Sequence, residues 1–136
     1  MKVEIVTPVG VKFSGEAAGV RAPGALGELG ILPGHRTMMA ALRTGVCIVA
    51  VPDKDPLHLV IDAGYVHVTD GKNVTITTEL CEGWKDIDAT VARVDQEKAT
   101  AALSAIKDDV STLLWQARRH DLDLAETRLR VAASKS

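Results

Sequence analysis

The chain has 136 residues and a formal net charge of −2, with 46% hydrophobic, 25% charged and only 3% aromatic residues. This composition supports a packed core of Val, Ile, Leu and Ala in one ordinary domain, or in a small domain with an appendage. The near-neutral charge does not favour nucleic acid as a partner, and no apolar run approaches the ~18 residues of a membrane span. Residues 1–8 include an acid and no long apolar stretch, which argues against a secretory signal.

Residues 1 to about 85 are rich in Val, Ile and Thr, and glycine, proline and aspartate separate them into short runs. Proline and glycine at Pro23 and Gly24 are expected to stop the third of these runs. Alternation is clear near residue 60, where one predicted face carries Leu57, Leu59 and Ile61. Because no helical pattern of 10–15 residues lies between the runs, we predict an antiparallel β-sandwich, or flattened barrel, rather than a parallel βαβ sheet.

The pattern changes at residues 82–86, and no glycine or proline follows Gly83. Either Asp86 or Asp88 can cap a first helix, whose apolar face contains Ala92, Ala99, Ala102, Leu103 and Ile106. Residues 107–109 interrupt the pattern, and a second stripe then contains Val110, Leu113, Leu114, Ala117, Leu122, Ala125, Leu129 and Ala132. We therefore predict an α+β chain, with a sandwich domain over residues 1–85 and an antiparallel two-helix hairpin over residues 86–136. The alanine-rich hairpin buries little apolar area, so we expect it to be among the least stable parts.

Residues 27–35 read Gly-Glu-Leu-Gly-Ile-Leu-Pro-Gly-His and lead into a small and apolar run. Proline presets φ for the second position of a turn, and glycine supplies the positive φ of the third position. Leu32 to His35 are therefore predicted to form a tight reversal with His35 at a loop tip. By residue type alone, Glu28 would be a solvated turn residue and His35 would only complete the turn, because charged turn residues are ordinary surface features.

Residues 27–35 resemble the signature of the epsilon subunit of bacterial and chloroplast F-type ATP synthases. Weaker similarities follow in the same order over nearly the whole chain, at residues 13–15, 63–68, 73–76, 86–88 and 127–131. The resemblance implies a non-catalytic central-stalk subunit at the cytoplasmic face of the bacterial inner membrane, peripheral to it and without a cofactor. It implies that the subunit couples proton-driven rotation to ATP synthesis, although the sequence leaves open whether the ion is H⁺ or Na⁺.

In such a subunit, the resemblance implies that the sandwich binds the gamma subunit and the c-ring. The helical hairpin lies against the sandwich or extends along gamma into the alpha/beta catalytic head, where it blocks hydrolysis. The sequence leaves both resting states of the hairpin open. The resemblance places Glu28, Gly30 and His35 at the contacts with the c-ring and gamma.

The second helix ends in a basic segment that the resemblance places against acidic groups of the catalytic head. Its candidates for these contacts are Arg118, Arg119, Arg128 and Arg130, with His120 and Lys135 nearby. An equally weighted alternative is a solvated helix end, in which the cations complement the helix macrodipole or pair along the helix with Asp121, Asp123 and Glu126.

Many bacterial epsilon subunits bind ATP through an Ile/Leu-Asp-x-x-Arg-Ala motif at the start of the first helix. Ile87, Asp88 and Ala92 match that motif, but Val91 occupies the arginine position. Arg93 lies about 200° around the helix from that position and cannot simply replace it. Without a guanidinium that grips phosphate bidentately, we expect weak or no ATP binding.

Other kinds of site have little support in the sequence. Glycines at 24, 27 and 30 have the wrong spacing for a phosphate loop, and the scattered histidines form no metal-ligand pair. Cys47 and Cys81 are isolated, so we expect reduced, mostly buried thiols in a cytosolic protein. A hydrolase that pairs one cysteine with a histidine would require rapid labelling of that cysteine at neutral pH. The main alternative is a stand-alone protein-binding adaptor, which co-purification from membranes would distinguish.

Overall fold

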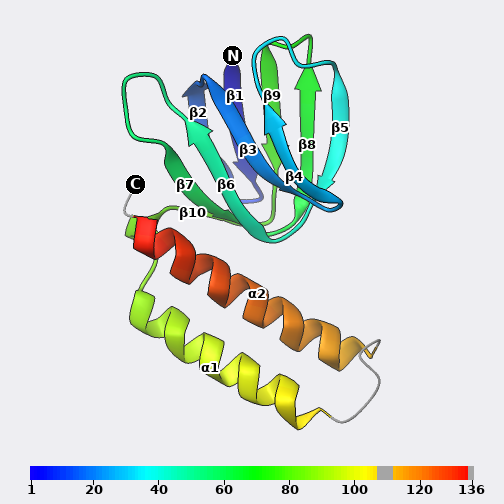
Figure 1. The fold of residues 1–136 in the computed structure, drawn as a ribbon, viewed down its shortest axis with the longest axis vertical. Helices are drawn as coiled ribbons and strands as arrows, with labels where there is room; N and C mark the ends of the chain where they lie inside the picture. The colour runs from blue at the N-terminus through cyan, green and yellow to red at the C-terminus, as the bar shows by residue number, and fades with distance from the viewer. Residues whose placement is uncertain (107–111, 135–136) are drawn as a thin grey trace.

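A computed structural model describes residues 1–106 and 112–134 of the chain. In this part, β-strands precede two α-helices, with a short 3₁₀ helix between them (Figure 1). The strands are β1 Lys2–Thr7, β2 Gly10–Glu16, β3 Gly19–Gly24, β4 Gly27–Ile31, β5 Met38–Leu42, β6 Gly45–Ala50, β7 Leu57–Ile61, β8 Gly64–Thr69, β9 Asn73–Thr77 and β10 Cys81–Glu82. The helices are η1 Trp84–Asp86, α1 Ala89–Ala105 and α2 Leu113–Ser134. The predicted α+β fold, a β-sandwich followed by two helices, is confirmed.

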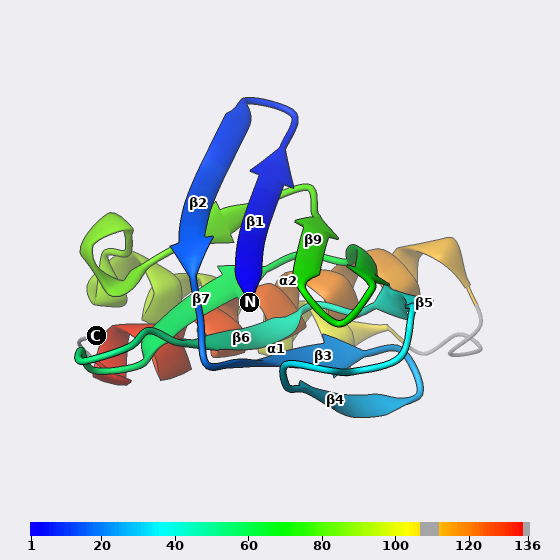
Figure 2. The same cartoon turned by 90° about the horizontal axis from the view of Figure 1, so that it is seen from above.

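The strands form one hydrogen-bonded sheet in the order β10-β7-β6-β3-β5-β8-β9-β1-β2, with β4 paired to β3. The sheet curls over on itself into a sandwich, which Figure 2 shows from above. Most pairs are antiparallel, as predicted, but β1 and β9 run parallel, with Ile5 opposite Ile76. Seven strands separate β1 from β9 along the chain, which leaves ample length for the crossover that a parallel pair needs.

The sandwich interior is aliphatic, as the composition predicted, and its fully buried side chains include Val3, Ile5, Val66, Val68 and Ile76. Strand β7 departs from the predicted alternation, because Leu59, Val60 and Ile61 are all buried. Val60 lies outside the main core cluster, and α2 contacts β7. The face of β7 that alternation left to solvent is therefore the face on which the hairpin packs.

Strand β3 does not stop before Pro23, as the sequence analysis expected. It continues to Gly24, and Pro23 lies opposite Glu28 of β4. The carbonyl of Pro23 accepts a hydrogen bond from the backbone N of Arg43 over 2.8 Å. Proline fits this position because its fixed φ is compatible with an extended strand at a place where no N–H donor is needed.

The two helices fold back against the sandwich, and α2 lies between α1 and the sheet (Figure 1). Asp88 is the N-cap of α1, since its carboxylate accepts hydrogen bonds from the backbone N of Thr90 and of Val91 at 2.9 and 3.2 Å. The carboxylate of Asp86 instead accepts from the backbone N of Gly83 at the start of η1. Because α2 has neighbours on two sides, its buried residues are Leu122, Ala125, Thr127 and Val131, whereas α1 buries only Ala92 and Ala99.

The prediction of an apolar stripe along the second helix is wrong at the start of that helix. Leu113 is 84% exposed, Leu114 is 56% exposed and Ala117 is also exposed. The first turns of α2 extend beyond the sandwich, so no sheet face covers them (Figure 1). Burial on α2 begins at Leu122. The predicted interruption at residues 107–109, Val110 of the stripe, and Lys135 lie outside the described residues.

Candidate functional site

The predicted reversal at residues 32–35 is present between β4 and β5. The backbone N of His35 donates to the carbonyl of Leu32 over 3.0 Å, and Gly34 has a φ of +88°, as the third position of a type II turn requires. The backbone N of Gly34 also donates to the carbonyl of Gly71 over 2.9 Å. A Cβ atom at Gly71 would lie 2.7 Å from the Cα of Gly34, so this turn and the β8–β9 turn pack too closely for a larger residue.

The three residues predicted to contact the c-ring and gamma are spread along β4 and the following turn. Glu28 lies near the start of β4 and forms a 2.8 Å ion pair with Arg21, in which both side chains are exposed. Gly30 is exposed, and a Cβ atom there would meet nothing within 4 Å. His35 is half-buried beyond the other end of the strand, and its Nδ1 lies 2.9 Å from the carbonyl oxygen of Arg36. Since a carbonyl only accepts, Nδ1 carries the proton of this hydrogen bond.

An apolar groove beside Gly30 was not identified from the sequence. It has a volume of about 490 Å³ and lies between β3, β4 and β6, where Val20, Ile31, Leu32 and Ile48 line it. The side chain of Leu32 is 66% exposed. In the sequence, the leucine next to the Pro-Gly turn was the feature that could have indicated this groove. The groove joins Gly30 to the turn and makes this face more apolar than Glu28 and His35 alone suggested.

Two polar contacts join α2 to the sandwich. The Nε2 atom of His120 lies 2.7 Å from Oδ1 of Asp62, and the hydroxyl of Thr44 donates to the same oxygen over 2.7 Å. Arg128 donates to both carboxylate oxygens of Glu82, at 2.7 and 3.4 Å. The side chains of Asp62 and Glu82 are only 18% and 23% exposed. Sequence reasoning missed both contacts, because their partners lie 58 and 46 positions apart.

The four arginines predicted to meet the catalytic head have different surroundings in the docked hairpin. Arg128 is held by the sandwich, as described above. Two others form exposed pairs along α2, which are Arg118–Asp121 at 2.8 Å and Arg119–Asp123 at 2.9 Å. Arg130 is exposed and forms no ion pair with the residues that the structure describes. The intrahelical pairing considered as the alternative is therefore present for two of the four.

The degenerate nucleotide motif borders a small, acidic cavity of about 210 Å³. Ile87, Asp88 and Ala92 all line it, and Val91, at the arginine position, is 55% exposed. The other charged groups of its lining are Glu82, Asp86, Asp95 and Arg128. Asp88 is committed to capping α1 and Arg128 to Glu82. Four carboxylates around one guanidinium repel a triphosphate, so this charge does not fit a nucleotide.

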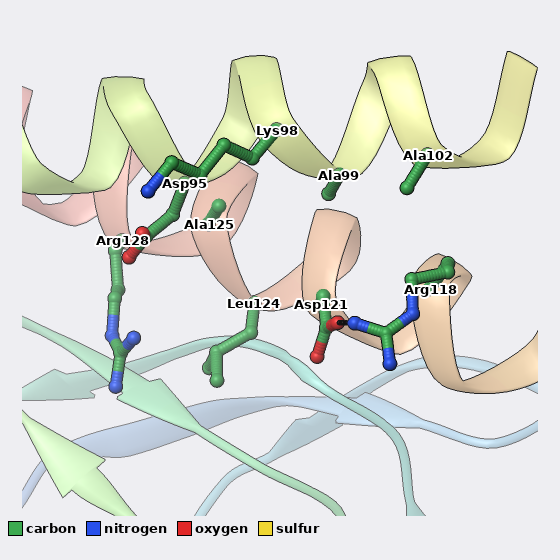
Figure 3. A pocket seen from close by; sticks show the side chains of 9 residues that line it. All are labelled: Asp95, Lys98, Ala99, Ala102, Arg118, Asp121, Leu124, Ala125 and Arg128. Atoms are coloured by element: carbon green, nitrogen blue, oxygen red, sulfur yellow. Dashed lines mark hydrogen bonds and ion pairs between the residues drawn. The ribbon is translucent and has the colours of Figure 1, made fainter. Parts of the chain in front are cut away.

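A second groove, of about 440 Å³, runs between the two helices (Figure 3). Ala99 and Ala102 point from α1 toward α2, and Ala125 is also part of the lining. The charged side chains in the same view are Asp95, Lys98, Arg118, Asp121 and Arg128. Facing alanines let the helices lie close together but bury little apolar area per residue. The contact between α1 and α2 is therefore a weakly apolar one.

Both cysteines are free and buried. Burial, helped by the neighbouring Cys81, raises the pKa of Cys47 to about 12. Burial also raises the pKa of Cys81, to about 11. Thiols with such pKa values stay protonated at neutral pH and are poor nucleophiles.

Residues 1–106 and 112–134 offer neither a metal site nor a membrane-spanning helix. Within these ranges, no group of three or more His, Cys, Asp or Glu side chains is arranged to hold a metal ion. Within the same ranges, no helix has the length and apolar character to cross a membrane. The candidate functional surfaces are therefore the face around β4 and the junction of the hairpin with the sandwich.

Known proteins are similar to this chain in sequence and in fold. The family model described as "ATP synthase, Delta/Epsilon chain, beta-sandwich domain" matches residues 1–83. The ATP synthase epsilon chain of Geotalea uraniireducens (strain Rf4) is 34% identical over 134 residues, covering 98% of this chain and 94% of that one. That of Sulfurovum sp. (strain NBC37-1) is 42% identical over 76 residues, which are 56% of this chain and 59% of that one.

A solved structure shows the same fold. A chain in the cryo-EM structure of the Euglena gracilis mitochondrial ATP synthase, OSCP/F1/c-ring in rotational state 1, superposes with a TM-score of 0.81. The match covers 96% of this chain and 79% of that chain at 23% identity, so it shows the fold alone.

The sandwich with its appended hairpin defines a class of small non-catalytic ATP synthase subunit. Within that class, the chain belongs to the epsilon-chain family of F-type ATP synthases. The resemblance first seen at residues 27–35 is thereby confirmed. Family membership gives no support to a cysteine hydrolase or to a stand-alone adaptor.

Proposed function

We propose that the chain is a rotor subunit at the foot of the central stalk, where it couples proton-driven rotation of the c-ring to ATP synthesis. Its sandwich unit, residues 1–85, binds the gamma subunit and the c-ring. Its hairpin unit, residues 86–136, restrains ATP hydrolysis by the alpha/beta head. The subunit acts as a peripheral component at the cytoplasmic face of the bacterial inner membrane. The whole-chain similarity to an epsilon chain, and a fold shared with a chain of an F1/c-ring assembly, support this proposal.

The face around β4 is the contact surface that we propose for gamma and the c-ring. Its centre is the apolar groove beside Gly30, with Glu28 earlier on β4 and His35 in the turn that follows that strand. An apolar centre with polar groups at its margin is the usual composition of a protein interface. Among the described residues, Glu28 forms an ion pair only with the exposed Arg21, so a basic group of a partner can replace that arginine at little cost.

The regulatory part of the proposal rests on how the hairpin is held. The α2 helix is attached to the sandwich through the contacts of His120 with Asp62 and of Arg128 with Glu82. Exposed ion pairs typically contribute about 0–1 kcal/mol each, and half-buried ones somewhat more. A hairpin held in this way can exchange sandwich carboxylates for those of another partner. Its release would free Arg128 from Glu82, so that it joins the exposed Arg118, Arg119 and Arg130 of the same helix as a candidate contact for the acidic surface proposed on the head.

The test is ATP hydrolysis by a reconstituted catalytic head with gamma, alone and with this chain. We expect the full chain to slow hydrolysis and residues 1–85 to leave it unchanged, once circular dichroism has shown that the shorter chain is folded. A Glu82→Gln variant, which weakens docking, is expected to inhibit at least as strongly as the full chain. Binding to gamma without an effect on hydrolysis would remove the regulatory claim, and failure to bind gamma would remove the proposed partners.

A further inference from the structure

Three arginines meet in one groove at the junction of α2 with the sandwich. The groove has a volume of about 470 Å³. The turn between β5 and β6 contributes Arg43, and α2 contributes Arg119, Asp123, Thr127 and Arg130. The four α2 residues are spaced by four, four and three positions, so they form one stripe along the helix. Because the walls come from the sandwich and from α2, the groove exists only when the hairpin is docked.

The positive charges of this groove are only partly neutralised. Arg119 is paired with Asp123 at 2.9 Å. The Nη1 atom of Arg43 donates to the backbone carbonyl of Thr44 over 3.3 Å, and neither Arg43 nor Arg130 forms an ion pair among residues 1–106 and 112–134. Three guanidiniums and one carboxylate therefore leave the groove with a formal charge of +2.

The nearby carboxylate of Asp62 lowers the local charge, but it is held by other side chains and forms no ion pair with Arg43 or Arg130 in the part of the chain that the structure describes. Its Oδ1 atom already accepts hydrogen bonds from Thr44 and His120, both at 2.7 Å. Docking brings the cation of Arg43 to a helix stripe that carries two arginines and one carboxylate, and the excess of like charge at this interface opposes its formation. An anion that bridged the two walls would convert this repulsion into attraction.

We propose that the groove binds a small oxyanion of the polyphosphate class, and that the bound anion holds the hairpin against the sandwich. Arginine suits this role because its planar guanidinium binds phosphate oxygens bidentately. Arg119 and Arg130 lie 11 residues apart, which is about 16 Å along a helix. Arginines that approach from the two ends of a groove favour two or more linked phosphates over a single phosphate.

The groove differs from the cavity at the degenerate nucleotide motif. The two share no lining residue, and that cavity is acidic whereas this groove is basic. No aromatic side chain lines the groove, so it offers nothing on which a base can stack. The phosphates alone are recognised. The inference concerns the docked chain and stands whether or not the hairpin inhibits hydrolysis.

Calorimetry with pyrophosphate on the full chain tests the site, at fixed ionic strength and without divalent cations. We expect saturable binding with a Kd below about 1 mM. Loss of one charge-assisted hydrogen bond should weaken it about tenfold in Arg43→Gln and in Arg130→Gln. Arg21→Gln is the matched control, because Arg21 is an exposed arginine paired elsewhere, with Glu28. Absence of saturable binding, or equal binding by the Arg43→Gln variant, would overturn the assignment.

ATP separates a phosphate site from a nucleotide site, because it carries the same phosphates on a nucleoside. We expect ATP to bind no more tightly than pyrophosphate. Affinity for ATP at least tenfold higher, and dependent on Arg43, would show that the nucleoside is recognised and would overturn the proposed ligand class.

Hydrogen exchange tests whether the anion bridges the two walls. Pyrophosphate is expected to slow exchange of the α2 amides in the wild-type chain and to leave them unchanged in Arg43→Gln. Arg43 belongs to the sandwich and the measured amides belong to the helix, so this result requires a connection between them. Sodium chloride of equal ionic strength is the control. If pyrophosphate binds without slowing exchange on α2, the proposed stabilisation of docking is wrong.

Discussion

The sandwich and the hairpin of this chain are held together by different forces. The sandwich encloses an aliphatic core in which Ile5, Ile61 and Ile76 have no exposed surface. The first helix buries only Ala92 and Ala99, and the contact between helices is made largely by small side chains. The hairpin then meets the sandwich through β6 and β7, the hydrogen bond of His120 with Asp62, and the half-buried Arg128–Glu82 ion pair. One part is therefore stabilised by the hydrophobic effect, and the other by contacts that a partner can replace.

The largest expected difference between the two parts appears on truncating a core side chain. Ile76→Ala removes fully buried methyl groups from the sandwich and is expected to lower the free energy of unfolding by about 2–5 kcal/mol in urea. Leu122→Ala, the matched change on α2, is expected to leave that main transition in place and to speed amide exchange on the helices. An equal shift of the main transition by both variants would show one cooperative unit and contradict the comparison.

The sandwich core carries a pH dependence at Cys47. Burial raises the pKa of Cys47 from 9.0 to about 12, so the folded chain keeps this thiol protonated while the unfolded chain ionises it. The stabilisation is complete below pH 9 and is lost as the pH rises toward 12. At pH 10, ionisation of this thiol in the unfolded chain lowers the free energy of unfolding by about 1.4 kcal/mol.

The measurement is urea unfolding at pH 7.5 and at pH 10, in the wild type and in Cys47→Ala. The wild type should lose about 1.4 kcal/mol more than the variant, because every other titratable group, Cys81 included, is present in both chains. A loss of the same size in the two chains would show that the thiol does not titrate in this way. For the same reason, a thiol reagent at pH 7.5 should label the folded chain slowly.

Weakening the attachment of the hairpin to the sandwich is expected to have a smaller effect on stability. A double-mutant cycle with Glu82→Gln and Arg128→Gln should give a coupling of about 1 kcal/mol in the free energy of opening α2, read by hydrogen exchange. The bidentate geometry and half-buried position of this pair raise its value above that of an exposed pair.

The Arg118–Asp121 pair is the internal control for this cycle. Both of its residues lie on α2, and their side chains are 42% and 49% exposed. Opening the hairpin leaves this pair intact, so its coupling should be close to zero. A coupling equal to that of Glu82 with Arg128 would mean that the sandwich contact does not hold the helix.

The sequence predicted local features of the fold well and their contacts poorly. The reversal before His35 followed from Pro33 and Gly34 because backbone φ preferences act within a few residues. The same kind of local hydrogen bond limited the cap of α1 to Asp86 or Asp88, and the structure shows that it is Asp88. Alternation located the sandwich core, but it failed at Val60, whose burial depends on a helix that begins more than 50 residues later.

The candidate site shows the same limit. The motif identified Glu28 and His35, yet it gave no sign that an apolar groove lies beside Gly30. The basic character of α2 was visible in the sequence, whereas the partners Asp62 and Glu82 were not. Ion-pair partners across a fold are chosen by tertiary packing, which leaves no periodic signal. The role proposed for Arg43 could not be predicted from the sequence, because it depends on the position of Arg43 beside α2 in the folded chain.

The smallest expected effect is the response to ATP at the degenerate motif. Two features of that site are expected to prevent ATP from binding. The absent arginine at Val91 is one defect, and the four carboxylates around the cavity are another. We expect no saturable calorimetric signal for ATP up to about 1 mM. The measurement uses the Arg43→Gln, Arg130→Gln double variant, in which binding at the basic groove is weakened about a hundredfold. A millimolar or tighter signal there would mean that Arg128 leaves Glu82 to bind phosphate, and that the nucleotide itself can release the hairpin from the sandwich.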